Sequence, residues 1–163
     1  MTDLNIKTYS ACAVASCILD MHAQNVIPYM GITKLIKLVY IAQGCVLGQS
    51  RGKEMLFLED VEAWHYGPAI RSLFGEMKAS EEAGEEIPLL LSYKEEAKEL
   101  KKDKKSYDII SEVVKYYHDY TAYRLTEITH EEGTPWHWAT ENKKLIIPKE
   151  IIADYYASKY PLS

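Results

Sequence analysis

The sequence lacks the features of a membrane or secreted protein. Its longest apolar stretch, residues 38–47, is too short and too interrupted to cross a bilayer. The first residues include Asp3 and Lys7 and form no long apolar run, so we expect no signal peptide. The cysteines number only three, and Cys12 and Cys17 are five positions apart, which is neither a metal-pair nor a redox spacing. We therefore expect buried, free thiols and a cytoplasmic protein.

An excess of positive charge is also missing. The chain carries 19 Lys and Arg residues against 24 Asp and Glu residues, a net charge of −5. A general binder of nucleic-acid phosphates needs a basic face, so nucleic acid is not an expected partner. The one dense basic run, residues 101–105, holds four lysines around Asp103. Such a run is usually a solvated helix end or loop, and contact with DNA is the alternative interpretation.

Familiar catalytic motifs are absent as well. The chain has no P-loop, no dinucleotide fingerprint and no Gly-x-Ser-x-Gly nucleophile elbow. His130, Glu131 and His137 suggest zinc at first, but the helical zinc motif needs two histidines four positions apart, and here Gly133 and Pro135 intervene. A closed site also needs three or four ligands. We expect no metal, no cofactor, no catalytic residues and no enzymatic activity.

What is present predicts a mainly α protein with a small β-hairpin or short sheet. A chain of 163 residues with 47% apolar residues is expected to form one domain around a real core. Apolar positions surround most of the segment that begins at Gly31, which predicts a central helix with Leu35 and Val39 buried. Gly44 and Gly48 in that helix either admit another element closely or end it.

Periodicity and turn signals place the other elements. Further helices are expected over residues 9–22, from Pro68 to Met77, from a cap at Ser106 to Tyr117, over 121–129, and from Pro148 to Tyr156. A hairpin is expected from residues 55–58 and 61–64, a loop over 133–138, a strand or strap over 87–91, and an exposed helix or loop over 94–105.

Two segments, residues 64–68 and 129–136, stand out because they combine large aromatic side chains, turn-forming residues and ionisable groups. The chain holds 13 Tyr and 3 Trp residues but only 2 Phe residues. Tyr and Trp join a large apolar area to a polar tip, and both are typical of protein–protein hot spots. For Trp64, Tyr66 and Trp136, a shaped groove and simple core packing both remain open.

The same segments carry a resemblance to a known family. Residues 32–44, 62–68 (EAWHYGP) and 128–136 (ITHEEGTPW), followed by a closing segment over 147–156, resemble in order and spacing the signatures of the Panacea domain. This family is known from GepA-type phage-associated proteins and SocA-type antitoxins. The similarity spans about residues 9–157. Two positions depart from the family pattern: His65 stands where a basic residue such as Lys is frequent, and Ile128 where Leu is usual.

The resemblance implies an antitoxin of a toxin–antitoxin system that neutralises a partner toxin protein by direct binding. A proteolytic adaptor is a variant of this role, with a protease or chaperone as a further partner. We expect the two aromatic segments to meet in space, and we assign their residues to two roles. The expected partner contacts are His65, Tyr66, His130 and Glu131, and the expected structural residues are Trp64, Gly67, Pro68, Pro135 and Trp136.

Two alternatives to the antitoxin role remain. The first is a small enzyme that uses His130 and Glu131 in a pocket between Trp64 and Trp136. The second is a phage or prophage regulatory module that contacts DNA through residues 101–105. No membrane partner is expected, and the sequence leaves the toxin, the stoichiometry and the oligomeric state open.

Overall fold

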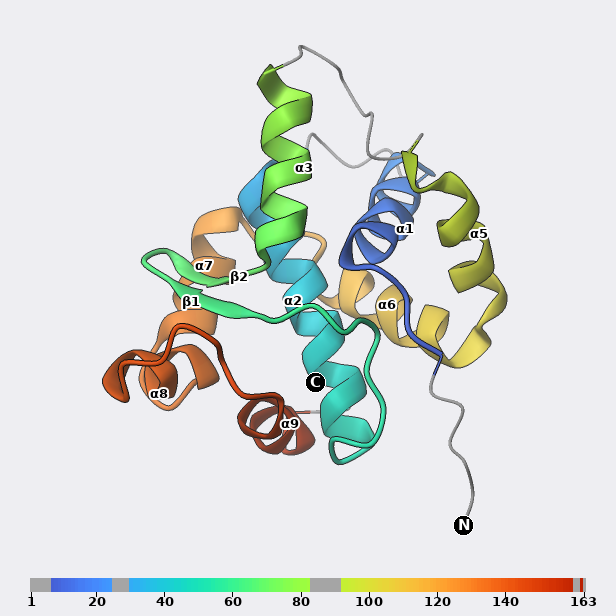
Figure 1. The fold of residues 1–163 in the computed structure, drawn as a ribbon. Coiled ribbons are helices and arrows are strands. Elements are labelled where there is room, and N and C mark those ends of the chain that lie inside the picture. Colours follow the sequence, from blue (N-terminus) through green and yellow to red (C-terminus); the bar gives the residue numbers. More distant parts are fainter. Residues whose placement is uncertain (1–6, 25–29, 83–91, 160–161, 163) are drawn as a thin grey trace.

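A computed structural model describes residues 7–24, 30–82, 92–159 and 162. Within this part, the chain forms eight helices and one two-stranded antiparallel sheet, which confirms the predicted mainly α fold (Figure 1). In chain order the elements are α1 (Ala11–Gln24), α2 (Ile32–Gln49), β1 (Glu62–Trp64), β2 (Gly67–Ala69), α3 (Arg71–Glu82), α5 (Lys94–Lys102), α6 (Lys104–Tyr117), α7 (Ala122–His130), α8 (Pro135–Glu141) and α9 (Lys149–Ala157). None of the described helices has both the length and the apolar character that a membrane span requires.

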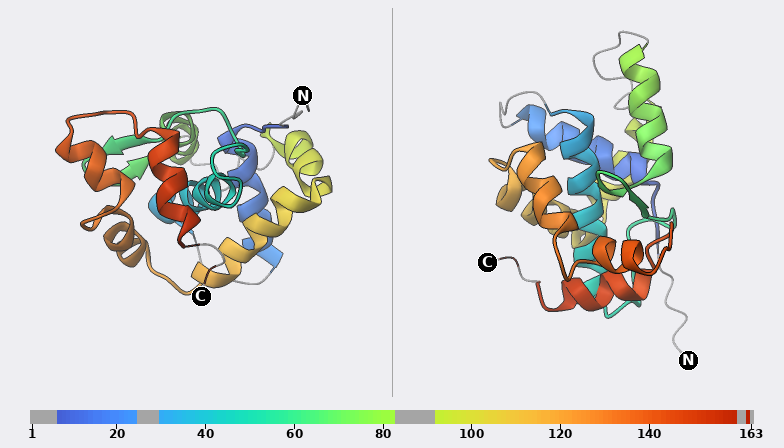
Figure 2. Two further views of the ribbon diagram at one scale, coloured as in Figure 1. Left: turned by 90° about the horizontal axis from the view of Figure 1, so that it is seen from below. Right: turned by 90° about the vertical axis from the view of Figure 1, so that its left-hand side faces the viewer.

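Helix α2 is the centre of the fold, as its apolar circumference predicted. It is buried at every position from Leu35 to Gly48, and both Leu35 and Val39 are fully buried. Figure 2 shows α2 enclosed by its neighbours, and α1, α3, α6, α7 and α9 all contact it. Gln43 is a polar residue inside this core, and its side-chain amide donates to the Phe57 carbonyl (2.8 Å) and accepts from the Leu56 N–H (2.7 Å).

Gly44 and Gly48 let α9 lie directly on α2. A Cβ atom on Gly44 would lie 2.4 Å from the ring of Tyr156, and one on Gly48 would lie 2.5 Å from the backbone carbonyl carbon of that residue. Real Cβ atoms do not approach other heavy atoms so closely, so both positions require glycine. Of the two roles expected for these glycines, the structure therefore shows the close approach of another element.

The prediction of a hairpin was right in part, but the partner predicted for residues 61–64 was wrong. Strand β1 pairs with β2 and not with residues 55–58, and its register is Glu62 with Ala69, Ala63 with Pro68 and Trp64 with Gly67. The helix expected to begin at Pro68 begins instead at Arg71, because Gly67, with φ of +111°, turns the chain back into a second strand. Phe57 forms a parallel bridge with Tyr9.

A third segment extends this small sheet. The Ala63 N–H donates to the Leu145 carbonyl (2.7 Å), and the Ile147 N–H donates to the Val61 carbonyl (2.8 Å). The chain between α8 and α9 therefore covers the edge of β1 that β2 leaves open. This pairing anchors the hairpin to the C-terminal part of the described chain.

The structure also differs from the prediction at the start of α6 and over residues 133–138. Helix α6 is capped by Asp103, whose Oδ1 accepts from the Ser106 N–H, so Ser106 lies inside the helix. The expected loop over 133–138 is largely helix α8, which Thr134 caps and Pro135 opens at the first position. Over the charged segment 94–105, of the two predicted alternatives, an exposed helix or a loop, the structure shows mostly a helix, α5. The strand or strap expected over 87–91 lies outside the described residues.

Candidate functional site

The two aromatic segments meet beside α2, as expected. The indole Nε1 of Trp136, at the start of α8, donates to the backbone carbonyl of Trp64 at the end of β1 (2.6 Å). His130, the last residue of α7, packs its ring on Trp136 with the ring centroids 5.3 Å apart. The junction therefore joins the hairpin, the end of α7 and the start of α8 into one unit.

Trp64 is held on its other side as well. Its Nε1 donates to Glu62 Oε1 (2.9 Å), and Arg71 donates to both oxygens of the same carboxylate (2.7 and 3.2 Å). These hydrogen bonds, first from Arg71 and then from Trp64, keep the pKa of Glu62 below its usual value. The Arg71 guanidinium lies over the Trp64 ring at 5.3 Å, and Phe74 meets that ring edge-on. Trp64 is thus a half-buried support and not a free surface ring.

A buried lysine that the sequence analysis did not single out lies beneath the turn. Lys37, on α2, is only 3% exposed, and its Nζ donates to the carbonyls of Tyr66 (3.1 Å) and Pro68 (2.8 Å). No carboxylate of the described chain lies within 4.0 Å of this ammonium group. Burial accordingly lowers the pKa of Lys37 to about 8.

Position 67 favours glycine for two reasons, the closeness of Lys37 and the φ angle of its backbone. A Cβ atom at Gly67 would lie 2.8 Å from Lys37 Nζ, and the φ angle of +111° strains any other residue. Two carbonyls of the turn thus receive hydrogen bonds from below, and a third, that of Trp64, receives one from Trp136. The main chain from Trp64 to Pro68 is therefore fixed by three hydrogen bonds from distant residues.

Above these supports, the turn exposes two rings. Tyr66 is 75% exposed, and His65 is exposed beside it, with the ring centroids 5.0 Å apart in an edge-to-face arrangement. His130 is half-buried and places its Nδ1 atom 3.2 Å from the Glu127 carbonyl. Glu131 is exposed but faces a separate hollow, lined also by Tyr155. Of the four predicted partner contacts, only Glu131 lines this hollow.

The expected structural residues lie where their backbone roles require. Gly67 and Pro68 are buried in β2, and Pro68 occupies a strand position although it has no N–H to donate. Pro135 is buried at the first position of α8, and Trp136 is half-buried. Helix α8 was not predicted, although the Thr-Pro pair at 134–135 is a helix-start signal and could have revealed it.

The remaining ionisable groups do not assemble into a reactive cluster within the described residues. No group of three His, Cys, Asp or Glu side chains there has a geometry that could hold a metal ion. His137 is paired with Glu141 on its own helix (3.7 Å). All three cysteines are buried and free, as predicted, and burial raises the pKa of the Cys45 thiol to about 12. A thiol with so high a pKa is a poor nucleophile at neutral pH.

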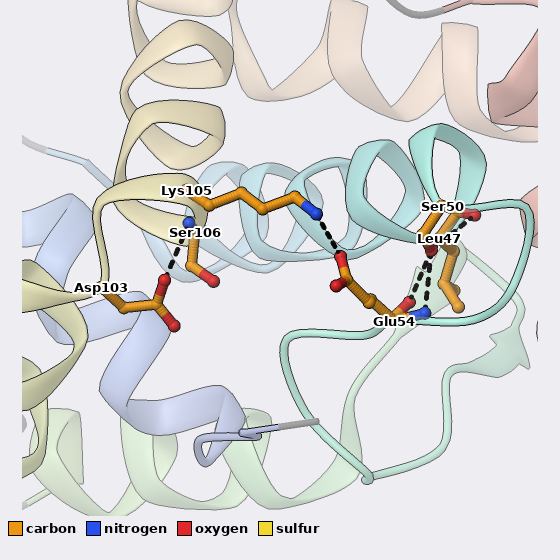
Figure 3. Close-up of polar contacts among 6 residues, drawn as sticks. All are labelled: Leu47, Ser50, Glu54, Asp103, Lys105 and Ser106. Atoms are coloured by element: carbon orange, nitrogen blue, oxygen red, sulfur yellow. Dashed lines mark hydrogen bonds and ion pairs between the residues drawn. The ribbon is translucent and has the colours of Figure 1, made fainter. Parts of the chain in front are cut away.

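The lysine run at residues 101–105 is matched by carboxylates. Figure 3 shows Lys105, at the start of α6, reaching Glu54 on the loop after α2 (2.7 Å). Lys101, Lys102 and Lys104 pair in the same way with Asp20, Glu99 and Asp108. Exposed pairs of this kind contribute little to stability, but they neutralise the positive potential that DNA would need.

A helical frame that fixes an exposed aromatic turn is suited to protein recognition, because aromatic residues are enriched at binding hot spots and a turn ordered in advance loses little entropy on binding. A comparison with protein families supports this class and narrows it. Residues 35–137, which include Lys37, the turn and Trp136, match the family model described as the SocA-like antitoxin, Panacea domain. The match covers more than half of the chain, and the chain belongs to this family. Membership supports an antitoxin role in general and, with it, a partner protein. The comparisons with curated proteins and with solved structures returned no match.

Proposed function

We propose that this protein is an antitoxin that neutralises a toxin protein by binding it directly through the exposed turn at His65 and Tyr66. The observation that carries the proposal is the contrast between the two sides of this turn. Its tip presents a tyrosine ring that is 75% exposed, while Lys37 and Trp136 hold its main chain from beneath.

Such an arrangement favours tight binding for a physical reason. Association costs free energy whenever a loop or side chain must be ordered, and a turn fixed in advance avoids most of that cost. A tyrosine ring then supplies a large contact area with only two rotatable bonds and a hydroxyl that can form a hydrogen bond. His65 extends the same surface, and the net charge of −5 favours a basic toxin and raises its association rate.

The experiment compares two tyrosines of equal exposure. Tyr66 and Tyr123 are both 75% exposed, but Tyr123 lies near the start of α7, whereas the junction is formed at the end of that helix. The wild type, Tyr66→Ala and Tyr123→Ala are each tested against the product of the adjacent reading frame. Growth rescue measures neutralisation, and isothermal titration measures affinity.

We expect Tyr66→Ala to lose about 2 kcal/mol or more of binding free energy, about a thirtyfold loss in affinity, as a central hot spot does. Tyr123→Ala should bind as the wild type does, and both variants should keep the wild-type thermal midpoint. A folded Tyr66→Ala protein that neutralises the toxin at full strength would refute the role of the turn.

The same strains distinguish neutralisation by a stable complex from delivery of the toxin to a protease. Toxin that stays intact in a stable complex indicates neutralisation by occupancy. Toxin that disappears from cells only when the antitoxin is present indicates delivery to a protease. In both cases the Tyr66→Ala variant should fail, because direct binding is the first step of each.

The second test concerns His130, which packs on Trp136 beside the turn. We expect His130→Ala to keep the fold and to weaken toxin binding by more than about 1 kcal/mol, the usual threshold for a contributing interface residue. Binding that falls only in proportion to lost stability would give His130 a structural role instead.

A further inference from the structure

A hollow of about 430 Å³ lies between the end of α6, the end of α7 and helix α9. Tyrosine side chains from two of these elements dominate its wall, with one carboxylate and one ammonium group. The residues that matter here are Tyr116, Tyr117, Tyr155, Tyr156, Glu131 and Lys159.

The rings present faces and edges in several directions. Tyr116 meets Tyr117 edge-to-face with the ring centroids 4.7 Å apart, and Tyr155 meets Tyr156 in the same way at 5.0 Å. The face of an aromatic ring carries a negative potential that attracts cations. The chain itself gives an example, because the Lys159 ammonium lies over the Tyr155 ring, 5.3 Å from its centroid.

Glu131 adds a full negative charge to this wall. It is exposed, and in the described part of the chain no cationic side chain lies within 4.0 Å of its carboxylate. The negative charge of Glu131 acts on Tyr155, which also lines the hollow. The pKa of Tyr155 is raised first by burial and then by the charge of Glu131. A carboxylate that has no cation of the described chain within 4.0 Å, at the wall of a hollow also lined by tyrosine rings, attracts a positive group.

The hollow also borders the turn that we propose as the binding site. Thr129 lines the hollow, and its Oγ1 lies 3.7 Å from the position that a Cβ would take on Gly67. One residue of α7 therefore separates the two features. A protein that covers Tyr66 reaches the hollow by extending across the end of α7.

We propose that this hollow binds an arginine side chain of the partner protein, with the guanidinium stacked on Tyr155 and paired with Glu131. This inference rests on the proposed function only in naming the toxin as the owner of that arginine. Arginine fits better than lysine because its planar, weakly hydrated group stacks on an aromatic face while its N–H groups reach a carboxylate. Lys159 now lies over the Tyr155 ring, and because it is exposed, it can move into solvent when the guanidinium stacks there.

The first experiment probes the hollow alone. Full-length protein is titrated with N-acetyl-L-arginine amide and with the citrulline analogue, which has the same shape and no charge, and chemical shifts are followed by NMR. We expect arginine amide to shift the signals of Tyr155 and Glu131 and to bind about fivefold more tightly than the citrulline analogue.

Glu131→Gln removes the charge and keeps the shape, and Glu132→Gln is its matched control, since the next residue is equally acidic and exposed but does not line the hollow. Glu131→Gln should weaken the binding of arginine amide about fivefold and leave the citrulline analogue unchanged. Equal binding of the two ligands, or equal effects of the two substitutions, would overturn the proposal.

The second experiment repeats the comparison with the toxin. Glu131→Gln should lower toxin affinity about fivefold relative to Glu132→Gln. If wild-type protein binds the toxin and the two variants bind it equally, the arginine site is wrong and the proposed function stands. If wild-type protein does not bind the toxin but selects arginine through Glu131, the proposed function is wrong and the arginine preference of the hollow stands.

Discussion

The buried ammonium group of Lys37 predicts a pH dependence that can be isolated from the rest of the protein. Burial lowers the pKa of Lys37 to about 8, whereas an exposed lysine titrates near 10.5. Between these two values, the unfolded chain binds a proton that the folded chain has already released. The free energy of unfolding therefore rises with pH across this window, and the contribution of Lys37 is least favourable below pH 8.

The size of the effect follows from the same two values. A difference of about 2.5 pKa units corresponds to about 3 kcal/mol, of which about 2 kcal/mol falls between pH 7.5 and pH 9.5. Lys37→Met keeps a long side chain of similar volume and removes the titrating group. The wild type should therefore gain about 2 kcal/mol of stability relative to Lys37→Met over that range.

The assay is urea unfolding of both proteins at pH 7.5, 8.5 and 9.5. Burial raises the pKa of the cysteines, for example that of Cys12 to about 11, so their contribution to stability falls as the unfolded thiols ionise. These groups are common to both proteins and cancel in the difference. A difference that stays constant or falls with pH would refute the reasoning. If Lys37→Met does not fold, the midpoint of Lys37 in the wild type, followed by NMR of labelled lysine, decides: we expect about 8, and a value near 10.5 contradicts the prediction.

Three further predictions concern the core, the packing of α9 and metal content. Leu35→Ala should lower the free energy of unfolding by about 2–5 kcal/mol, because the side chain is fully buried, and an unchanged thermal midpoint would contradict this. Gly48→Ala should cost about 1–3 kcal/mol by forcing α9 away, whereas the matched change Gly75→Ala, which meets nothing within 4 Å, should cost nothing in the same unfolding assay. Elemental analysis of the purified protein should show no stoichiometric zinc, because the spacing of His130 and His137 does not close a site; one zinc per chain, lost on changing either histidine, would overturn this.

The helical frame was predictable because its signals are local. The central helix, its buried Leu35 and Val39, and the cap of α7 at Thr121 all follow from apolar period and cap chemistry, which depend on residues within a few positions of one another. The packing of α9 against Gly44 and Gly48 was among the alternatives that these glycines suggested, because a helical glycine removes the side chain that keeps two helices apart.

The hairpin was mispredicted because strand pairing is not local. Residues 55–58 have the composition of a strand, and no Asn-Gly or Asp-Gly signal marks the turn at 65–66. Gly67-Pro68 is equally typical of the start of a helix, and the turn around Gly67, whose φ angle is +111°, is held by hydrogen bonds from Lys37 that no local pattern encodes. Short strands of three residues take their register from such contacts.

The central element of the site, Lys37, left only a weak signal in the sequence. A lysine within an apolar helix can extend its ammonium group to solvent, or it can bury that group and donate hydrogen bonds to interior acceptors. The sequence does not distinguish these two outcomes. The acceptors of Lys37 are carbonyls about thirty positions away, on a turn whose conformation was itself mispredicted. That the two aromatic segments meet could therefore be predicted from the sequence, but Lys37, which holds the turn between Trp64 and Pro68, could not.

The supports of the turn also determine when during synthesis it takes shape. The hydrogen bond to the Trp64 carbonyl cannot form until Trp136, 72 positions later in the chain, has been made. The edge of β1 cannot be paired until residues 145–147 have been made. Contacts between such distant residues form late, because the intervening chain must be made and ordered first. A ribosome that has added Tyr66 has therefore produced its ring before the contacts that fix the turn exist, and the edge of β1 stays uncovered until residues 145–147 are made. Under the binding role that we propose for the turn, an ordered site exists only after Trp136 and residues 145–147 have been translated.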